Sequence, residues 1–401
     1  MTAANAPRRP IYLDHQATTP TDPRVTEAML PWFREKFGNP ASPHAYGAEA
    51  EKAVETARAE IAALIGAEPR EIVFTSGATE ANNLAIKGAV RFKGAPASRV
   101  VTFATEHKCV LESVEALRRE GAEISVLPVE RDGLVDLARL AEAIGLRTVL
   151  VSVMAANNEI GVVQPVAEIG ALCRSRGVLF HTDAAQAAGK VPIDVGEMGI
   201  DLLSISGHKL YGPMGVGALY VRRRPRVRLE PLFSGGGQER GFRSGTLPTP
   251  LCVALGVAVR IAREGMDEEG ARLRGLRDRL HAAIRAQLPD VVLNGDAERR
   301  LPGNLNLSFP GVDARDLIPA LGDIAVSSGS ACTAASVEPS YVLRALGVDD
   351  RLAAASIRFG LGRWTSAAEI DYAAEQVVRT VVRLRAAGTG ATGFDRRVET
   401  S

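Results

Sequence analysis

A lysine and an aspartate, each placed a few residues after a short apolar run, are the side chains best suited to chemistry in this sequence. Lys209 follows the run 202–205, and Asp183 follows the run 178–180. A desolvated lysine amine can form a Schiff base with a carbonyl group. An aspartate beside the pyridinium nitrogen of pyridoxal phosphate keeps that nitrogen protonated. Either residue alone is more typical of a buried polar group, but the pair, with phosphate-binding candidates nearby, indicates pyridoxal phosphate chemistry.

Three further positions can complete such a site. Gly77-Ala78-Thr79 opens a helix-like stretch. Backbone N–H groups, the helix dipole and the Thr79 hydroxyl can hold a phosphate there, although the same residues suit a plain helix cap. His107 follows another apolar run and can stack on a ring or shuttle protons, the alternative being a structural hydrogen bond. Gln186 lies just after Asp183 and can bind a ring substituent.

A cysteine in a run of small residues is a candidate nucleophile. Cys332 lies in Ser327-Ser-Gly-Ser-Ala-Cys-Thr333, just past a strand-like run. Such a run favours a thiol on a mobile loop over a buried structural thiol, and the alternative is a free cysteine in a turn. The other cysteines, Cys109, Cys173 and Cys252, lie in helix-like apolar stretches and are predicted to be small core residues.

Arginines offer two further interpretations. Arg358 alternates with apolar neighbours in Ser356-Ile-Arg-Phe, so its side chain points away from them. Its planar guanidinium can bind a substrate carboxylate through two parallel hydrogen bonds, and the alternative is a salt-bridged arginine at a domain interface. The arginine-rich stretch 222–228 fits either a solvated face or a docking site for an acidic protein.

Length and composition bound the class of protein. The 401 residues predict two to three domains with ample core, and the net charge of +1 gives no bias toward nucleic acid or membranes. The four cysteines are far apart, without the spacing of a zinc site or a disulfide framework, which favours a reducing compartment. No signal peptide or membrane-spanning run is evident. We therefore expect a cytoplasmic protein.

The elements that position these residues follow from the hydrophobic pattern. Apolar residues at spacings of three and four predict a helix over 47–66. Between 72 and 206, strand-like runs alternate with helix-like stretches, which is typical of a mostly parallel sheet covered on both faces. Polar clusters follow five of those runs, and strand carboxyl ends share one edge of a parallel sheet, so the clusters should converge on one crevice. A smaller α+β domain is predicted from about residue 260, ending in a mobile tail over 386–401.

Several motifs together resemble group I cysteine desulfurases, the housekeeping enzymes that supply sulfur for iron–sulfur cluster assembly. They run from residue 11 to about 363 and include FGNPAS, TSGATEANNLAIKG, NNEIGVVQP, HTDAAQAAGK, SGHKLYGP, GGGQERGFRSGTLP, SSGSACT and SIRFGLGR. The resemblance implies a fold-type I pyridoxal phosphate-dependent transferase of α/β class. Its large domain, with a mostly parallel seven-stranded sheet between helices, would span 18–260. The small α+β domain would comprise 1–17 and 261–385 and carry the mobile Cys332 loop.

The resemblance also implies residue roles. Lys209 would bind the cofactor covalently, Asp183 would pair with the pyridinium, Gln186 would contact the ring hydroxyl, and His107 would stack on the ring as a further catalytic residue. The residues expected to hold the phosphate are Ala78, Thr79, Ser206 and His208, with Thr246 contributed by the other subunit of a homodimer. Asn158, also in contact with the cofactor, and Arg358 would receive the carboxylate of L-cysteine.

The implied reaction converts L-cysteine to L-alanine and leaves a persulfide on Cys332. The acceptors would be an iron–sulfur scaffold protein or a tRNA-thiolation carrier, and Cys332 could briefly ligate a nascent iron–sulfur cluster shared with the scaffold. The last residues, AAGTGATGFDRRVETS, do not resemble the scaffold-docking segment of housekeeping members, which leaves the acceptor open. A selenocysteine lyase or β-lyase with the same cofactor, which would not require Cys332, and a sulfur-trafficking scaffold without turnover are the alternatives.

Overall fold

The computed structural model describes residues 10–328 and 339–391, so the predicted Cys332 loop lies outside the described residues. The chain divides into two compact units. The first comprises residues 18–158 and 162–267, and the second comprises the described parts of 1–17, 159–161 and 268–401. The boundary at 267 falls within the long helix α8 (Thr249–Gln287). Among the described residues, no helix is long and apolar enough to cross a membrane.

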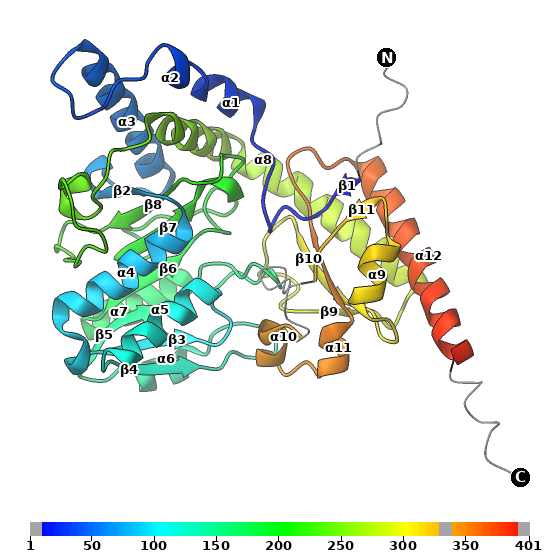
Figure 1. Ribbon diagram of the computed structural model, residues 1–401. Helices are drawn as coiled ribbons and strands as arrows, with labels where there is room; N and C mark the ends of the chain where they lie inside the picture. The colour runs from blue at the N-terminus through cyan, green and yellow to red at the C-terminus, as the bar shows by residue number, and fades with distance from the viewer. Residues whose placement is uncertain (1–9, 329–338, 392–401) are drawn as a thin grey trace, which may run out of the picture. The chain divides into compact units, whose positions relative to one another are not determined.

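A seven-stranded sheet forms the centre of the first unit (Figure 1). Its strand order is β2-β8-β7-β6-β5-β3-β4, and only β8 runs antiparallel to its neighbours. The strands are β2 (Ile72–Thr75), β3 (Arg99–Phe103), β4 (Glu123–Leu127), β5 (Thr148–Ser152), β6 (Leu179–Asp183), β7 (Leu202–Ser206) and β8 (Gly217–Val221). The predicted mostly parallel sheet is therefore confirmed.

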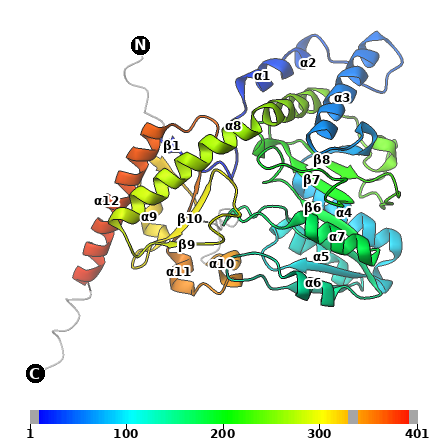
Figure 2. The same ribbon diagram turned by 180° about the vertical axis from the view of Figure 1, so that it is seen from behind.

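Helices cover both faces of this sheet. Helices α4 (Ala78–Lys93) and α5 (Lys108–Arg119) lie on the face toward the viewer in Figure 1, and α7 (Val166–Arg176) lies on the opposite face, seen in Figure 2. Buried aliphatic side chains of α4, α5 and the strands form one core. The remaining helices of this unit are α1 (Pro23–Met29), α2 (Pro31–Arg34), α3 (Ala45–Leu64), α6 (Leu137–Ala143) and the first part of α8. The predicted helix over 47–66 corresponds to α3, whose apolar stripe is buried.

The second unit is a smaller α+β arrangement. Its antiparallel sheet has the order β12-β10-β9, and β1 pairs with β11 in parallel. These strands are β1 (Ile11–Tyr12), β9 (Val292–Leu293), β10 (Asn304–Ser308), β11 (Ile324–Ala325) and β12 (Ser356–Gly360). The helices are α9 (Ala314–Ala320), α10 (Tyr341–Ala345), α11 (Asp350–Ala354), α12 (Ala367–Ala391) and the end of α8. Helix α12 continues past residue 385, into the segment predicted to be a tail.

The strand β6 is longer than its apolar run. It extends to Asp183, so His181 lies within the strand and not in the polar cluster predicted to follow it. The His181 ring is fully buried between two serines of the neighbouring strands: Nδ1 lies 2.8 Å from Ser152 Oγ and Nε2 lies 3.1 Å from Ser204 Oγ. Hydrogen bonds at both ring nitrogens allow this polar side chain to occupy the centre of the sheet.

We expect His181 to make the folded state less stable as the pH drops below about 6.5. Burial lowers the pKa of His181 from 6.5 to about 3. The unfolded chain therefore binds a proton in this range and the native chain does not, so the free energy of unfolding falls by about 1.4 kcal/mol per pH unit. In urea titrations at about pH 6.5 and about pH 5, the unsubstituted chain should lose roughly 2 kcal/mol more than His181→Gln. Equal losses would contradict a neutral buried imidazole.

Candidate active site

The predicted site residues of the first unit gather at one edge of its sheet. Strands β6 and β7 are adjacent and parallel, with Asp183 paired to Ser204, so Asp183 and Ser206 end neighbouring strands on the same side. Ser206 is in turn paired to Gly217 of β8, and Gly217 to Thr75 at the end of β2. The carboxyl ends of three strands and the start of β8 therefore form one continuous edge, as the sequence predicted.

Lys209 lies in the turn that leaves this edge. It ends a short 3-10 helix, η4 (Gly207–Lys209), directly after Ser206, and its side chain is half-buried. A segment near the start of the unit fixes the turn: the backbone N–H and the hydroxyl of Thr19 each donate to the carbonyl oxygen of His208 at 2.9 Å. The same hydroxyl accepts the N–H of Tyr211 at 2.8 Å. Hydrogen bonds between Thr19 and residues before and after Lys209 therefore fix the backbone that carries the lysine.

The surroundings of His208 are positively charged. Its Nδ1 lies 3.0 Å from the Thr18 hydroxyl. Burial, followed by the ammonium groups of Lys209 and Lys190, lowers the pKa of His208 to about 4. The imidazole is therefore neutral at physiological pH, and two lysine charges remain beside it. Such a cluster favours an anionic ligand.

Asp183 belongs to a polar network that the sequence analysis only partly identified. Its Oδ2 accepts a hydrogen bond from Asn82 Nδ2 at 2.7 Å, and its Oδ1 accepts one from the N–H of Ala185 at 2.9 Å. Asn82 Nδ2 also donates to Cys109 Sγ at 3.1 Å, and that sulfur lies 3.0 Å from His107 Nδ1. The network connects the predicted ring-binding aspartate with the predicted ring-stacking histidine.

This network corrects the prediction for one cysteine. Cys109 is half-buried and in contact with polar groups, whereas a core position was predicted. Cys173 and Cys252 are buried as predicted, and burial raises the pKa of each thiol to about 12. Sequence reasoning also missed Asn82, which is fully buried. Its signal was a polar residue among the small apolar residues of the predicted helix.

The tautomer of His107 follows from its position. It is the N-cap residue of α5, and its Nδ1 accepts a hydrogen bond from the N–H of Cys109 at 3.2 Å. A nitrogen that accepts cannot also carry the proton of the neutral ring, so the proton lies on Nε2. The preceding Glu106 is fully buried, and its Oε1 accepts the N–H of Met154 at 2.6 Å. Burial and then the charge of Asp183 raise the pKa of Glu106 well above its usual range, while the Met154 hydrogen bond opposes the shift.

The predicted phosphate-binding turn has open space at its centre. Gly77 precedes α4 with φ of 150°, and a Cβ placed there would meet no atom within 4 Å. The turn can lie this close to strand β8 only because Gly217 has no side chain. A Cβ at Gly217 would lie 2.7 Å from Gly77 Cα. Ala78 and Thr79 begin the helix, where backbone N–H groups have no partner within the helix and can bind an anion. Gly217 was also missed, although a lone glycine in a strand is typical of close backbone approach.

These residues fit pyridoxal phosphate. The turn before α4 offers a cradle that a side chain would fill, and the lysine cluster supplies positive charge. Asn82 Oδ1 is buried and accepts no hydrogen bond from the described residues, which leaves a polar atom beside Asp183 available to a ligand. A carboxylate, an amine and an imidazole on the same edge are the donor set that this cofactor uses. The residues that would hold it are Lys209, Asp183, Gln186, His107, Ala78, Thr79, Ser206 and His208.

The remaining predicted residues are described by the units and contacts in which they occur. Arg358 belongs to the second unit, where its buried guanidinium binds Asp14 Oδ1 at 2.8 Å and Ser327 Oγ at 2.7 Å. Asn158 is half-buried at the end of the first unit's segment 18–158, and Thr246 is exposed. Gln186 accepts a hydrogen bond from Lys190 Nζ at 3.2 Å.

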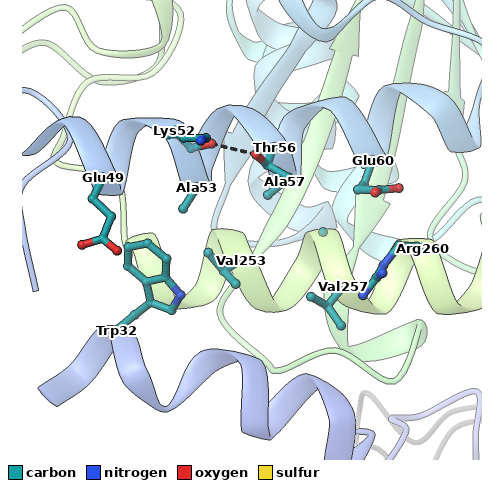
Figure 3. Close-up of a pocket in the computed structure, with 11 residues that line it drawn as sticks. Trp32, Glu49, Lys52, Ala53, Thr56, Ala57, Glu60, Val253, Val257 and Arg260 are labelled. Atoms are coloured by element: carbon teal, nitrogen blue, oxygen red, sulfur yellow. Dashed lines mark hydrogen bonds between the residues drawn. The ribbon is translucent and has the colours of Figure 1, made fainter. Parts of the chain in front are cut away.

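Two other surface features lie apart from the predicted site. A cavity of about 440 Å³ lies among α2, α3 and α8 (Figure 3), and the side chains that line it include none of the predicted site residues. In the arginine-rich stretch 222–228, Arg222 pairs with Asp201, and Arg223 pairs with Glu68. Those two arginines therefore have partners within the chain, whereas Arg224, Arg226 and Arg228 are exposed, so both interpretations of the stretch stay open.

The fold and this edge define a pyridoxal phosphate-dependent enzyme. The sequence model of the family Aminotransferase class-V matches residues 11–373. The chain is 59% identical to "Cysteine desulfurase IscS" of Rickettsia bellii (strain OSU 85-389) over 377 residues, which cover 94% of this chain and 92% of that protein. It is 59% identical to "Cysteine desulfurase" of Homo sapiens over 378 residues, which cover 94% of this chain and 83% of that protein.

Solved structures agree with these sequence relatives. A "NIFS-LIKE PROTEIN" is similar with a TM-score of 0.87 and 36% identity, covering 93% of this chain and 100% of that one. The structure "SspA in complex with cysteine" is similar with a TM-score of 0.78 and 38% identity, covering 89% of this chain and 100% of that one. The chain therefore belongs to the class-V aminotransferase family, within which it groups with the cysteine desulfurases.

Proposed function

We propose that this protein is a cysteine desulfurase that uses pyridoxal phosphate to transfer the sulfur of L-cysteine to Cys332. The observation that carries the proposal is the edge shared by Lys209, Asp183 and the turn before α4, in a chain that groups with the cysteine desulfurases. The C–S bond of L-cysteine breaks and an S–S bond forms on Cys332. L-cysteine and the Cys332 thiol become L-alanine and the Cys332 persulfide, so atoms and electrons balance without an added oxidant.

The residues of the sheet edge have separate roles in this proposal. When bound, the cofactor supplies an electron sink for charge that develops at the substrate Cα. Lys209 Nζ holds the cofactor and then moves the Cα proton. Asp183, oriented by Asn82 and the N–H of Ala185, would keep a proton on the ring nitrogen of the cofactor. His107 would stack on the cofactor ring, with its Nε2–H available for a hydrogen bond, because Nδ1 is used by the backbone.

The substrate carboxylate is assigned to Arg358 and Asn158. The assignment of Arg358 is supported by the hydrogen bonds that hold its side chain. Asp14 and Ser327 both bind Nη2, which fixes the orientation of the planar guanidinium. A fixed guanidinium loses little rotamer entropy when it binds a carboxylate. The salt bridge foreseen as the alternative for Arg358 is therefore present, and its partner is a residue of the same unit.

We assign a homodimer, in which Thr246 reaches the cofactor phosphate of the other subunit. Thr246 is exposed and lines a cavity of about 250 Å³ together with Asn39 and Arg240. Phe37 and Tyr46 are 68% and 55% exposed, and their rings stack with centroids 5.6 Å apart. Large exposed aromatic side chains that gather on one region are typical of protein interfaces.

The domain division and the later steps are part of the same proposal. The cofactor domain spans 18–260, and the small domain comprises 1–17 and 261–385; the two compact units support a division of this kind. The acceptors are an iron–sulfur scaffold protein or a tRNA-thiolation carrier, and Cys332 ligates a nascent cluster transiently. The compartment is the cytoplasm, supported by the wide spacing of the four cysteines.

Paired quantitation of alanine and sulfide tests this function. Purified protein with pyridoxal phosphate, L-cysteine and a thiol reductant should release alanine and sulfide in equal amounts, because each persulfide on Cys332 is reduced once per turnover. Pyruvate and ammonia in place of alanine would indicate β-elimination, and Cys332 would then lose its role as the sulfur acceptor.

A further inference from the structure

The segment 234–246, which carries Thr246, is exposed for most of its length but anchored by one buried carboxylate. Glu239 has a side chain that is 1% exposed, and its two oxygens accept hydrogen bonds from Arg58 Nη1 at 2.8 Å and Nη2 at 2.7 Å. The N–H of Phe74 donates to Glu239 Oε2 at 2.7 Å. An exposed segment is thereby attached to helix α3 by a buried, bidentate ion pair, a contact of high geometric specificity, and to strand β2 by a backbone hydrogen bond.

The partner of Glu239 is itself fixed. Arg58 belongs to α3, donates to the carbonyl oxygen of Ile72 at 2.7 Å and lies over the Phe74 ring, 4.8 Å from its centroid. Glu239 and Arg240 have positive φ values of 49° and 58°. Non-glycine residues keep this left-handed backbone only where the surroundings determine it. Here the ion pair between Arg58 and Glu239 holds the backbone in this conformation.

The side chains of Gln238 and Arg243 hold the rest of the segment through further hydrogen bonds. Gln238 Oε1 accepts the N–H of Gly245, the residue before Thr246, at 2.8 Å. Arg243 Nε donates to Glu80 Oε1 at 2.9 Å, and Glu80 Oε2 accepts the N–H of Ser76 at 2.8 Å. Glu80 therefore connects the segment with the turn before α4.

We propose that Glu239 and Gln238 are positioning residues that present Thr246 to the cofactor phosphate of the other subunit. This inference rests on the proposed homodimer. The inference specifies which of the two cofactor sites is affected: Glu239 acts on the partner's cofactor site and not on the site of its own chain. A residue with a merely structural role would affect its own chain's site at least as strongly.

Mixed dimers of two differently tagged chains test this direction. Lys209→Ala in one chain leaves a single lysine-bearing site, whose affinity for pyridoxal phosphate is measured by the absorbance of the lysine-bound cofactor. With Glu239→Gln in the same chain as Lys209→Ala, that site should bind the cofactor about tenfold more weakly, the loss expected for one hydrogen bond to a charged group. With Glu239→Gln in the chain that carries Lys209, the affinity should equal that of the reference dimer without Glu239→Gln.

Weakening in the second dimer, or none in the first, would overturn the inference. Thr246→Ala in place of Glu239→Gln tests the proposed homodimer contact separately from the positioning role. If Thr246→Ala has no effect on the other chain's site, the homodimer contact itself is wrong. If Thr246→Ala weakens that site and Glu239→Gln does not, only the positioning role fails. If Glu239→Gln prevents folding, Gln238→Ala replaces it in both mixed dimers, because Gln238→Ala removes no buried charge. Sedimentation of each mixed dimer checks that it stays dimeric.

Discussion

Lys209→Ala is expected to lower the turnover of L-cysteine by about 10⁴-fold, the upper range for loss of a positioned proton-transfer group. The turn that carries Lys209 is held by hydrogen bonds from Thr19 to the backbone, so the substitution removes the amine without removing the turn. Alanine release measures the turnover. Retention of cofactor after gel filtration measures the covalent attachment, which should also be lost.

Lys52→Ala is the matched control for this substitution. Lys52 is an exposed lysine of α3 that lines the cavity in Figure 3, away from the predicted site residues. Its removal should leave turnover and cofactor retention unchanged. If Lys209→Ala kept more than about one hundredth of the activity, another group would have to move the Cα proton, and the assignment of Lys209 would be wrong.

Cys332→Ala is expected to abolish the persulfide and to lower the combined release of alanine and sulfide by a factor on the order of 10⁶, as for loss of a nucleophile. The cofactor and L-cysteine should still bind, because none of the residues assigned to hold them is changed. Mass spectrometry of the intact chain after L-cysteine addition, without reductant, measures the persulfide. The two readouts together separate loss of sulfur transfer from loss of the site.

Cys252→Ala provides the control for the cysteine. Cys252 is buried, and its pKa is raised to about 12, so its thiol is protonated and unreactive near neutral pH. The control variant should form the persulfide as the unsubstituted chain does. Continued release of alanine from Cys332→Ala would instead favour the selenocysteine lyase alternative, and release of pyruvate and ammonia would favour the β-lyase alternative; no thiol of the chain takes part in either.

Local patterns predicted the sheet and the positions of its polar ends. Apolar runs place β2, β3, β5, β6 and β7, and the residue after a parallel strand must lie at the shared edge. Lys209, Asp183 and the turn before α4 could therefore be grouped without coordinates. The roles of individual residues came from the family resemblance, because the same polar types also serve as caps and core hydrogen bonds.

Contacts between distant segments could not be predicted. Asn82 and Asp183 are 101 residues apart, and nothing in the local sequence around Asn82 identifies its partner. Arg58 and Glu239 are 181 residues apart, so each appears in the sequence as an ordinary charged residue. His181 directly follows the apolar run 178–180, so the local pattern places it in the polar cluster after that run. Hydrogen bonds from serines on two other strands allow it to remain in the strand.

The antiparallel position of β8 has a consequence for the order of folding. Ser206 pairs with Gly217, so Lys209 lies in the connection of a hairpin whose two strands are close in sequence. Hairpins form within about 1–10 μs, whereas contacts between distant segments must first overcome the entropy of closing a long loop. The lysine turn should therefore take shape early, and the aspartate network, which joins β6 to α4, should follow. The nascent chain acquires its anchoring amine before it acquires the pocket that gives this amine its reactivity.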